Sequence, residues 1–88
     1  MNLKYARMQS GKRPSTVAIE SGISKQRYYI IEKTNKISST NEFTARQIAD
    51  SLGVNLFDVC DAGVLKFMPK TADEKAKLLK VIEKIEVE

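Results

Sequence analysis

The sequence predicts an all-α fold, and three of its features lead to this prediction. Glycine and proline are rare, with four Gly and two Pro among 88 residues, so few positions interrupt regular structure. No segment alternates apolar and polar residues in the way that a half-buried strand does. Apolar residues instead recur at helical intervals, between good N-cap residues and glycine stops. We therefore expect a small domain of short helices.

The first helix is predicted at residues 2–10, before Gly11, a suitable C-terminal stop. Leu3, Ala6 and Met8 are its expected inward residues. Arg7 lies among these inward positions, where a charged side chain is costly unless it has a partner.

Residues 14–33 predict two further short helices joined by a tight turn. Pro14 suits the first position of a helix, where its missing N–H is no loss. Gly22 can end that helix in the left-handed conformation, which glycine adopts without steric penalty. Ala18 is small enough for the two helices to cross closely, and Ser24 is a good N-cap for the second helix. This spacing is typical of a helix-turn-helix.

The second helix of this pair has an apolar side and a polar side. Tyr28 and Ile31 should face the core together with Ile23. The outward residues can form hydrogen bonds to base edges and phosphates. They are Lys25, Gln26, Arg27, Tyr29, Ile30 and Lys33. The alternative interpretation, a merely solvated helix face, is disfavoured by the Ala-Gly-Ile-Ser spacing before it.

A polar loop, residues 34–40, separates this pair from a fourth predicted helix. Ser39 and Glu42 have the spacing of a capping box, in which each side chain bonds to the backbone N–H of the other residue. Gly53 is expected to end the helix. Its apolar residues, at mostly helical intervals, are Phe43, Ala45, Ile48, Ala49 and Leu52.

A fifth helix is predicted from Asn55, a good N-cap, to a stop at Gly63. Cys60 is expected to be a small buried residue within this helix. Residues 64–70 are apolar but interrupted by Pro69, so we expect an extended connector there.

Residues 71–88 predict a final amphipathic helix, beginning with the capping-box spacing of Thr71 and Glu74. A helix of about 15 residues is marginally stable alone in water, so its apolar stripe must pack on the domain, on a second copy or on another protein. We expect the stripe to form a dimer or partner interface. Its members are Leu78, Val81, Ile82 and Ile85, with Leu79 at the edge. The predicted organisation is thus a domain at 1–63, a connector at 64–70 and a helix at 71–88.

Positive charge is concentrated in the first part of the chain, although the net charge is only +4. Residues 1–53 hold nine Lys or Arg against four Asp or Glu, whereas residues 54–88 hold six against seven. The surplus therefore belongs to the part with the helix-turn-helix pattern, as expected for contact with a phosphate backbone.

The composition argues against several classes of protein. With no histidine and a single cysteine, the chain lacks the common zinc sites, a His-based triad and an intramolecular disulfide. Because we find no paired carboxylates, activated nucleophile or Gly-rich phosphate loop, we expect no enzyme, no cofactor and no metal. The chain also lacks a signal-peptide core and any run near the roughly 20 apolar residues of a membrane span. We expect a cytoplasmic protein without membrane association.

Several motifs together resemble the phage repressor and Cro type of helix-turn-helix, the XRE family, whose members are Cro/cI-like. They are LKYAR at 3–7, Val17-Ala18 before Gly22-Ile23-Ser24, Ile31-Glu32, and IADSLGV at 48–54. The resemblance covers residues 3–60. It implies a five-helix lambda-repressor-like DNA-binding domain, with the C-terminal helix as an addition and the helix from Lys25 lying in the major groove.

The resemblance also implies roles for individual residues. The positions that would approach base edges are Lys25, Gln26, Arg27, Tyr29 and Ile30. We expect phosphate contacts from Arg13, Ser15, Lys33, Asn35 and Lys36. The family pairs an arginine of its first helix with the glutamate that ends its third, and these positions are Arg7 and Glu32 here.

Three departures from the family pattern affect these roles. Pro14 stands where many members have a polar, phosphate-binding residue, and Ser15 replaces it only in part. The loop after Glu32 is longer than usual. Tyr28 and Tyr29 are larger than typical, so we expect one of them to be a core residue whose hydroxyl reaches the DNA backbone.

The sequence thus predicts a sequence-specific double-stranded DNA-binding transcriptional regulator of the repressor kind. It would bind a palindromic operator as a homodimer, associated with the nucleoid in a bacterial or phage-encoded setting. The alternative is a protein-interaction module, an antitoxin or adaptor that binds a partner through its C-terminal helix. The charge and polarity of the helix from Lys25 favour DNA.

Overall fold

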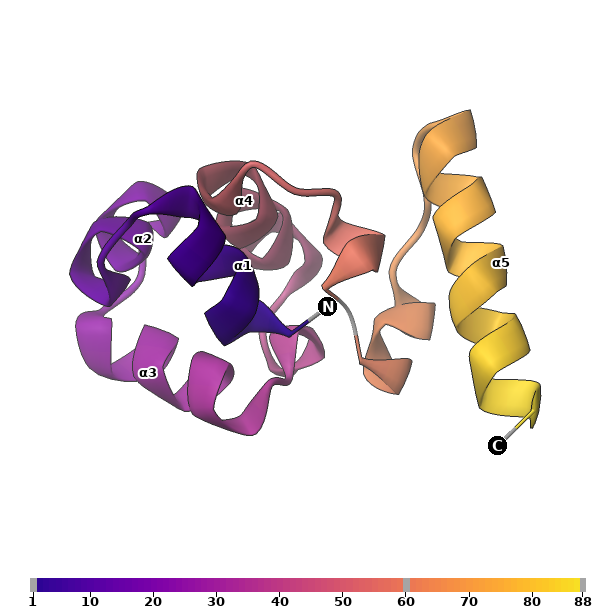
Figure 1. Ribbon diagram of the computed structural model, residues 1–88, viewed down its shortest axis with the longest axis horizontal. Helices are drawn as coiled ribbons and strands as arrows, with labels where there is room; N and C mark the ends of the chain where they lie inside the picture. The colour runs from indigo at the N-terminus through magenta and orange to yellow at the C-terminus, as the bar shows by residue number, and fades with distance from the viewer. Residues whose placement is uncertain (1, 60, 88) are drawn as a thin grey trace.

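Across residues 2–59 and 61–87, which the computed structural model describes, α-helices and short 3-10 turns enclose an apolar core (Figure 1). None of these residues forms a strand, so the all-α prediction is confirmed for this part of the chain. The helices are α1 (Leu3–Ser10), α2 (Pro14–Ser21), α3 (Lys25–Thr34), α4 (Glu42–Leu52) and α5 (Ala72–Val87). The 3-10 turns are η1 (Ile37–Ser39), η2 (Leu56–Asp58) and η3 (Ala62–Lys66). In Figure 1, α5 lies at one end of the body that α1 to α4 form.

The predicted glycine stops end three of these helices. Gly11, Gly22 and Gly53 follow α1, α2 and α4 with φ of 73°, 72° and 72°. Pro14 is the first residue of α2, as predicted. The N-cap of α4 differs from the prediction, because Asn41 and not Ser39 accepts the hydrogen bond, from the Thr44 N–H at 2.7 Å.

Ser39 does not cap α4 because it belongs to η1, where its hydroxyl donates to the Lys36 carbonyl at 2.7 Å. The partner expected for it in the capping box is also engaged elsewhere. Glu42 accepts from the Met68 N–H at 3.1 Å and from Arg46 at 3.2 Å, and these bonds hold the pKa of the Glu42 carboxyl below its usual value. Other local bonds, together with one contact that is remote in sequence, from Met68, have therefore replaced the expected capping box.

The core is made by the predicted inward faces, with two exceptions. Met8 and Phe43 are 63% and 72% exposed. At 100° per residue, each lies on the side of its helix opposite the buried residues. The fully or nearly fully buried apolar residues include Leu3, Ala6, Val17, Ala18, Tyr28, Ile31, Ile37, Ala45, Ile48, Ala49 and Leu52.

The expected fifth helix is absent, and η2 and η3 take its place. The Asn55 side chain accepts from the Phe57 N–H at 2.9 Å, a bond between residues two apart that favours a turn over a helix. Asp61 likewise accepts from the Gly63 N–H at 3.1 Å and so begins η3. Gly63 therefore lies inside a turn and is not a helix stop. The prediction for Cys60 lies outside the described residues.

Asp61 also joins η3 to η1. Its carboxylate accepts from the Ser38 N–H at 3.1 Å and from the Ser38 hydroxyl at 2.5 Å. Burial raises the pKa of Asp61, but these bonds and the one from Gly63 outweigh it, so the pKa lies below its usual value.

The predicted connector is not extended throughout, because η3 continues to Lys66. Val64 and Phe67 are buried in the same core as α1 to α4, whereas Leu65 and Met68 are exposed. The segment is therefore part of the body and not a simple spacer.

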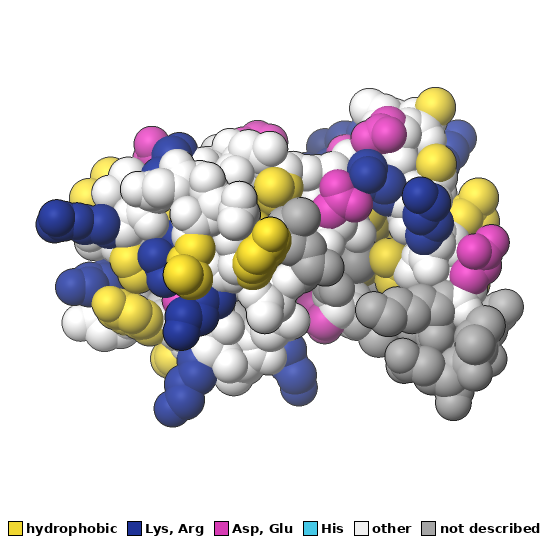
Figure 2. Space-filling model, viewed as in Figure 1, with side chains coloured by type: hydrophobic (Ala, Val, Ile, Leu, Met, Phe, Trp, Pro, Cys, Tyr) yellow, Lys and Arg dark blue, Asp and Glu magenta, His cyan; other side chains and the backbone are white. Residues whose placement is uncertain are grey.

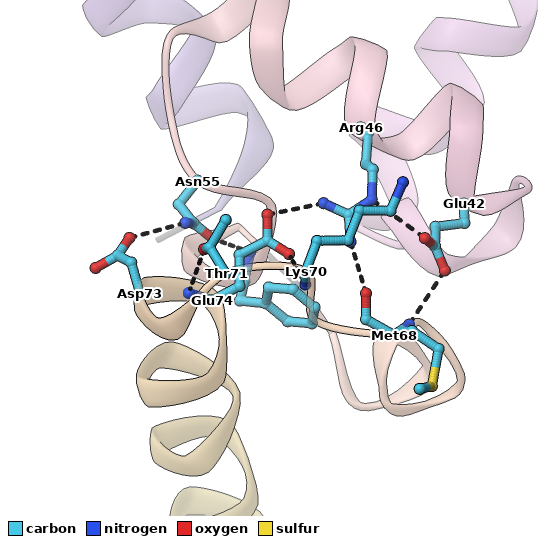
Figure 3. Close-up of polar contacts among 9 residues, drawn as sticks. Glu42, Arg46, Asn55, Met68, Lys70, Thr71, Asp73 and Glu74 are labelled. Atoms are coloured by element: carbon cyan, nitrogen blue, oxygen red, sulfur yellow. Dashed lines mark hydrogen bonds and ion pairs between the residues drawn. The ribbon is translucent and has the colours of Figure 1, made fainter.

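Arg46 of α4 joins the body to the start of α5 (Figure 3). Its guanidinium donates to the Met68 carbonyl at 2.7 Å and to the Glu74 carboxylate at 2.8 Å, in addition to Glu42. Glu74 also accepts from the Lys70 N–H at 2.9 Å. The Arg46 hydrogen bond is the main cause of a lowered pKa at Glu74. Thr71 caps α5 as predicted, accepting from the Glu74 N–H at 3.1 Å.

The apolar stripe of α5 packs in part on its own chain. Leu78 contacts the core cluster, Val81 and Ile82 are half-buried, and Leu79 is exposed. The side chain of Ile85 lies outside the described residues. No helix in the described part of the chain is both long and apolar enough to cross a membrane.

The ion pair expected between α1 and α3 is present. Arg7 Nε lies 2.6 Å from Glu32 Oε1, and the two side chains are only 15% and 9% exposed. Arg7 also donates to the Lys12 carbonyl at 3.1 Å. The hydrogen bond to Glu32 raises the pKa of the guanidinium. Tyr28 is the core tyrosine, but its hydroxyl donates to Glu32 at 3.1 Å and so does not extend toward solvent.

We expect Arg7→Ala to lower the free energy of unfolding by about 2 kcal/mol, because Glu32 would keep its charge in a shielded position without its cation. The thermal midpoint should fall by roughly 10 °C for a domain of this size. Lys33→Ala, which removes the same charge from an exposed position, should have little effect. Equal midpoints for Arg7→Ala and the parent would contradict this prediction.

We expect Gly63→Ala to cost about 2 kcal/mol of stability through overpacking. The added methyl group would overlap Ser38 Oγ and lie 2.9 Å from Ser38 Cβ. Urea denaturation can test this, with the same substitution made in a Ser38→Gly background as the control. Because that background removes both atoms, the cost should shrink there, and an equal cost in both backgrounds would refute the steric explanation.

Candidate nucleic-acid interface

The turn between α2 and α3 has the geometry that the sequence predicts. Gly22 adopts the left-handed conformation, and the Ile23 N–H donates to the Ala18 carbonyl at 3.0 Å. Ala18 is buried where the two helices pack against each other. The Ser24 hydroxyl then accepts from the Arg27 N–H at 3.1 Å and caps α3. These bonds fix the direction in which α3 leaves the turn.

One side of α3 is buried and the other is exposed. Tyr28 and Ile31 are completely buried, whereas Tyr29 and Ile30 are 47% and 54% exposed. We refer to the exposed residues of α3 that were predicted to face outward as the α3 outer face. It comprises Lys25, Gln26, Arg27, Tyr29, Ile30 and Lys33, all exposed as predicted.

The α3 outer face combines positive charge with hydrogen-bond donors and acceptors. Lys25 Nζ lies 5.7 Å from the centre of the Tyr29 ring, within range of a cation–π contact. Among the described residues, Gln26 and Lys33 make no side-chain hydrogen bond and remain available to a ligand. Figure 2 shows Lys and Arg side chains projecting from the end of the molecule that holds α2 and α3.

Arg27 differs from the rest of the α3 outer face. Helical periodicity places it beside the buried Ile31, and its guanidinium donates to the Ser39 carbonyl of η1 at 2.9 Å. A contact between Arg27 and a base would therefore require this bond to break. The bond between Arg27 and Ser39 could not be predicted from the sequence, because the two residues meet only in the folded chain.

The five residues predicted to contact phosphate lie in different settings. Arg13, Lys33 and Lys36 are exposed, and Ser15 is half-buried in the first turn of α2. Asn35 has a structural role that the sequence analysis missed. It ends α3 in the left-handed conformation, with φ of 54°, and its Oδ1 accepts from the Leu3 N–H at 2.9 Å. A signal was present, since asparagine adopts this conformation more readily than other non-glycine residues.

Comparison with known proteins assigns no function to this surface. No protein-family model, no curated protein and no solved structure matches the chain. The described residues also include no group of three or more Cys, Asp or Glu placed to hold a metal ion.

We expect Ser24→Ala to destabilise the protein by about 1 kcal/mol, because the first turn of α3 would lose its side-chain cap. Ser24→Asp is the matched control, since aspartate also caps well and should retain the stability of the parent. Urea denaturation monitored by circular dichroism would measure both variants. If alanine and aspartate gave the same stability as serine, the cap would not contribute to holding α3.

Proposed function

We propose that the protein is a sequence-specific regulator of transcription that binds double-stranded DNA with α3 in the major groove. The observation that carries this proposal is the α3 outer face, a solvent-exposed helix side with cationic, amide and apolar groups. An α-helix fits the major groove, and these are the groups that distinguish base pairs there. Gln26 would pair with adenine, Lys25 with guanine, and Ile30 would contact a thymine methyl group.

The way in which α3 is held supports this proposal. Ser24 caps its beginning, Asn35 ends it, and the ion pair between Glu32 and Arg7 joins its last turn to α1. A helix fixed at both ends can present its side chains with little loss of conformational freedom on binding. The uneven charge of the chain would add a sequence-independent attraction to phosphates.

Within the same proposal, the chain is a lambda-repressor-like domain of the XRE family that acts as a homodimer on a palindromic site. The Arg7–Glu32 pair and the turn at Gly22 support the family assignment. A dimer would place two copies of α3 about 34 Å apart, one turn of DNA. Because Leu78 already packs on its own core, the half-buried Val81 and Ile82 are the better candidates for contact with a second copy.

Selection from random duplex DNA, followed by titration at several salt concentrations, tests the proposal. We expect an enriched inverted repeat and a steep decrease in affinity as salt rises. Gln26→Ala should weaken binding to that repeat by about 10- to 100-fold, equivalent to roughly 1–3 kcal/mol, and leave non-specific binding unchanged.

Gln9→Ala is the control, because Gln9 is an exposed glutamine on α1 for which no DNA contact is proposed. Its affinity should equal that of the parent. The proposal that α3 recognises the base sequence would be refuted if no motif were enriched. It would also be refuted if Gln26→Ala bound the enriched motif as tightly as the parent. Absence of binding would favour the alternative of a protein-interaction module.

A further inference from the structure

A groove of about 490 Å³ runs between the start of α1 and the second half of α3. Tyr29 and Lys33 belong both to this groove and to the α3 outer face, so the two surfaces are continuous. The residues that line the groove are Asn2, Lys4, Tyr29, Glu32, Lys33 and Asn35. Neither Asn2 nor Lys4 was expected from the sequence to contact a ligand.

The two asparagines of the groove are oriented by backbone bonds. Asn2 Oδ1 accepts from the Tyr5 N–H at 2.7 Å, and Asn35 Oδ1 accepts from the Leu3 N–H at 2.9 Å. Because each side-chain oxygen already accepts a backbone hydrogen bond, the NH₂ group of each amide can donate to a ligand. The groove thus presents hydrogen-bond donors from two separate elements.

The charges of the groove also suit an anion. Lys4 and Lys33 are exposed, and neither forms an ion pair with another described residue. The first turn of α1 contains no acidic residue, so the positive end of its helix dipole is not offset there. The one carboxylate in the groove, Glu32, is neutralised because both of its oxygens face the Arg7 guanidinium.

We propose that this groove binds a backbone phosphate of duplex DNA, with Lys4 and the Asn2 amide as contacts from α1. The inference rests on the proposed function. With α3 in the major groove, a DNA strand that borders this groove would pass beside Tyr29 and Lys33. Amide and ammonium groups are common donors to phosphate oxygens, and such contacts set the position of a protein on DNA without reading sequence. The start of α1 is therefore a second DNA-contacting element.

Two variants test the groove in the full chain. Lys4→Gln removes the ammonium group, and Asn2→Asp keeps a capping oxygen for α1 while replacing the NH₂ donor with a negative charge. Lys75→Gln is the control for both, because it changes the net charge by the same amount at an exposed position of α5. Thermal midpoints of all three should match that of the parent, since aspartate and asparagine cap equally well.

The readout is the slope of the logarithm of the binding constant against the logarithm of salt concentration, measured with duplex DNA. We expect Lys4→Gln to make this slope less negative by about 0.9 for each bound protomer, the contribution of one phosphate contact. The affinity should fall equally for selected and random duplexes. Asn2→Asp should also bind more weakly than Lys75→Gln.

The outcomes separate this inference from the proposed function. If the parent binds DNA with a steep salt dependence but Lys4→Gln and Asn2→Asp behave like Lys75→Gln, the groove does not contact phosphate and reading by α3 is unaffected. If the parent shows no salt-dependent binding to any duplex, both proposals are wrong. A reduced slope for Lys4→Gln together with weaker binding by Asn2→Asp, neither of them seen for Lys75→Gln, supports the inference.

Discussion

The shielded pairing of Arg7 with Glu32 is the constraint on which the arrangement of the first three helices depends. Neither charge is well exposed, so each is tolerated only in the presence of the other. Tyr28 adds a second contact at this place, because its hydroxyl donates to the same carboxylate. The last turn of α3 is thereby held against α1, and rotation of α3 about its axis would expose Tyr28 and separate the pair. The side of α3 that faces solvent is a direct consequence.

Asn35 connects the end of α3 to the beginning of α1 by a second route. Its left-handed backbone ends α3, and its side-chain oxygen binds the N–H of Leu3, a donor that α1 cannot itself satisfy. One residue thus completes two helix termini. Lys4 and Lys33 line the same groove, so the proposed DNA-binding surface would extend from one helix to its neighbour.

Local chemistry made much of this fold predictable from the sequence. Gly11, Gly22 and Gly53 end helices where expected, and Ser24 caps α3, because these effects act within a few residues. Several of the failures result from contacts between distant parts of the chain. The segment expected as a fifth helix became η2 and η3, in part because the Asp61 carboxylate bonds to Ser38, 23 residues away. The α3 outer face was predictable because it follows from helical periodicity. The bond from Arg27 to Ser39 and the groove were not, because they arise only in the folded chain.

The contacts of Arg46 bear on where this protein could be cut or fused. Two of its acceptors, the Met68 carbonyl and the Glu74 carboxylate, lie beyond residue 63, the expected end of the domain. Val64 and Phe67, buried in the core, also lie beyond it. A fragment ending at residue 63 would leave a hole in the core and a guanidinium with only Glu42 for a partner. Leu78, in the second turn of α5, also contacts the core cluster, so a fusion joint belongs after that residue.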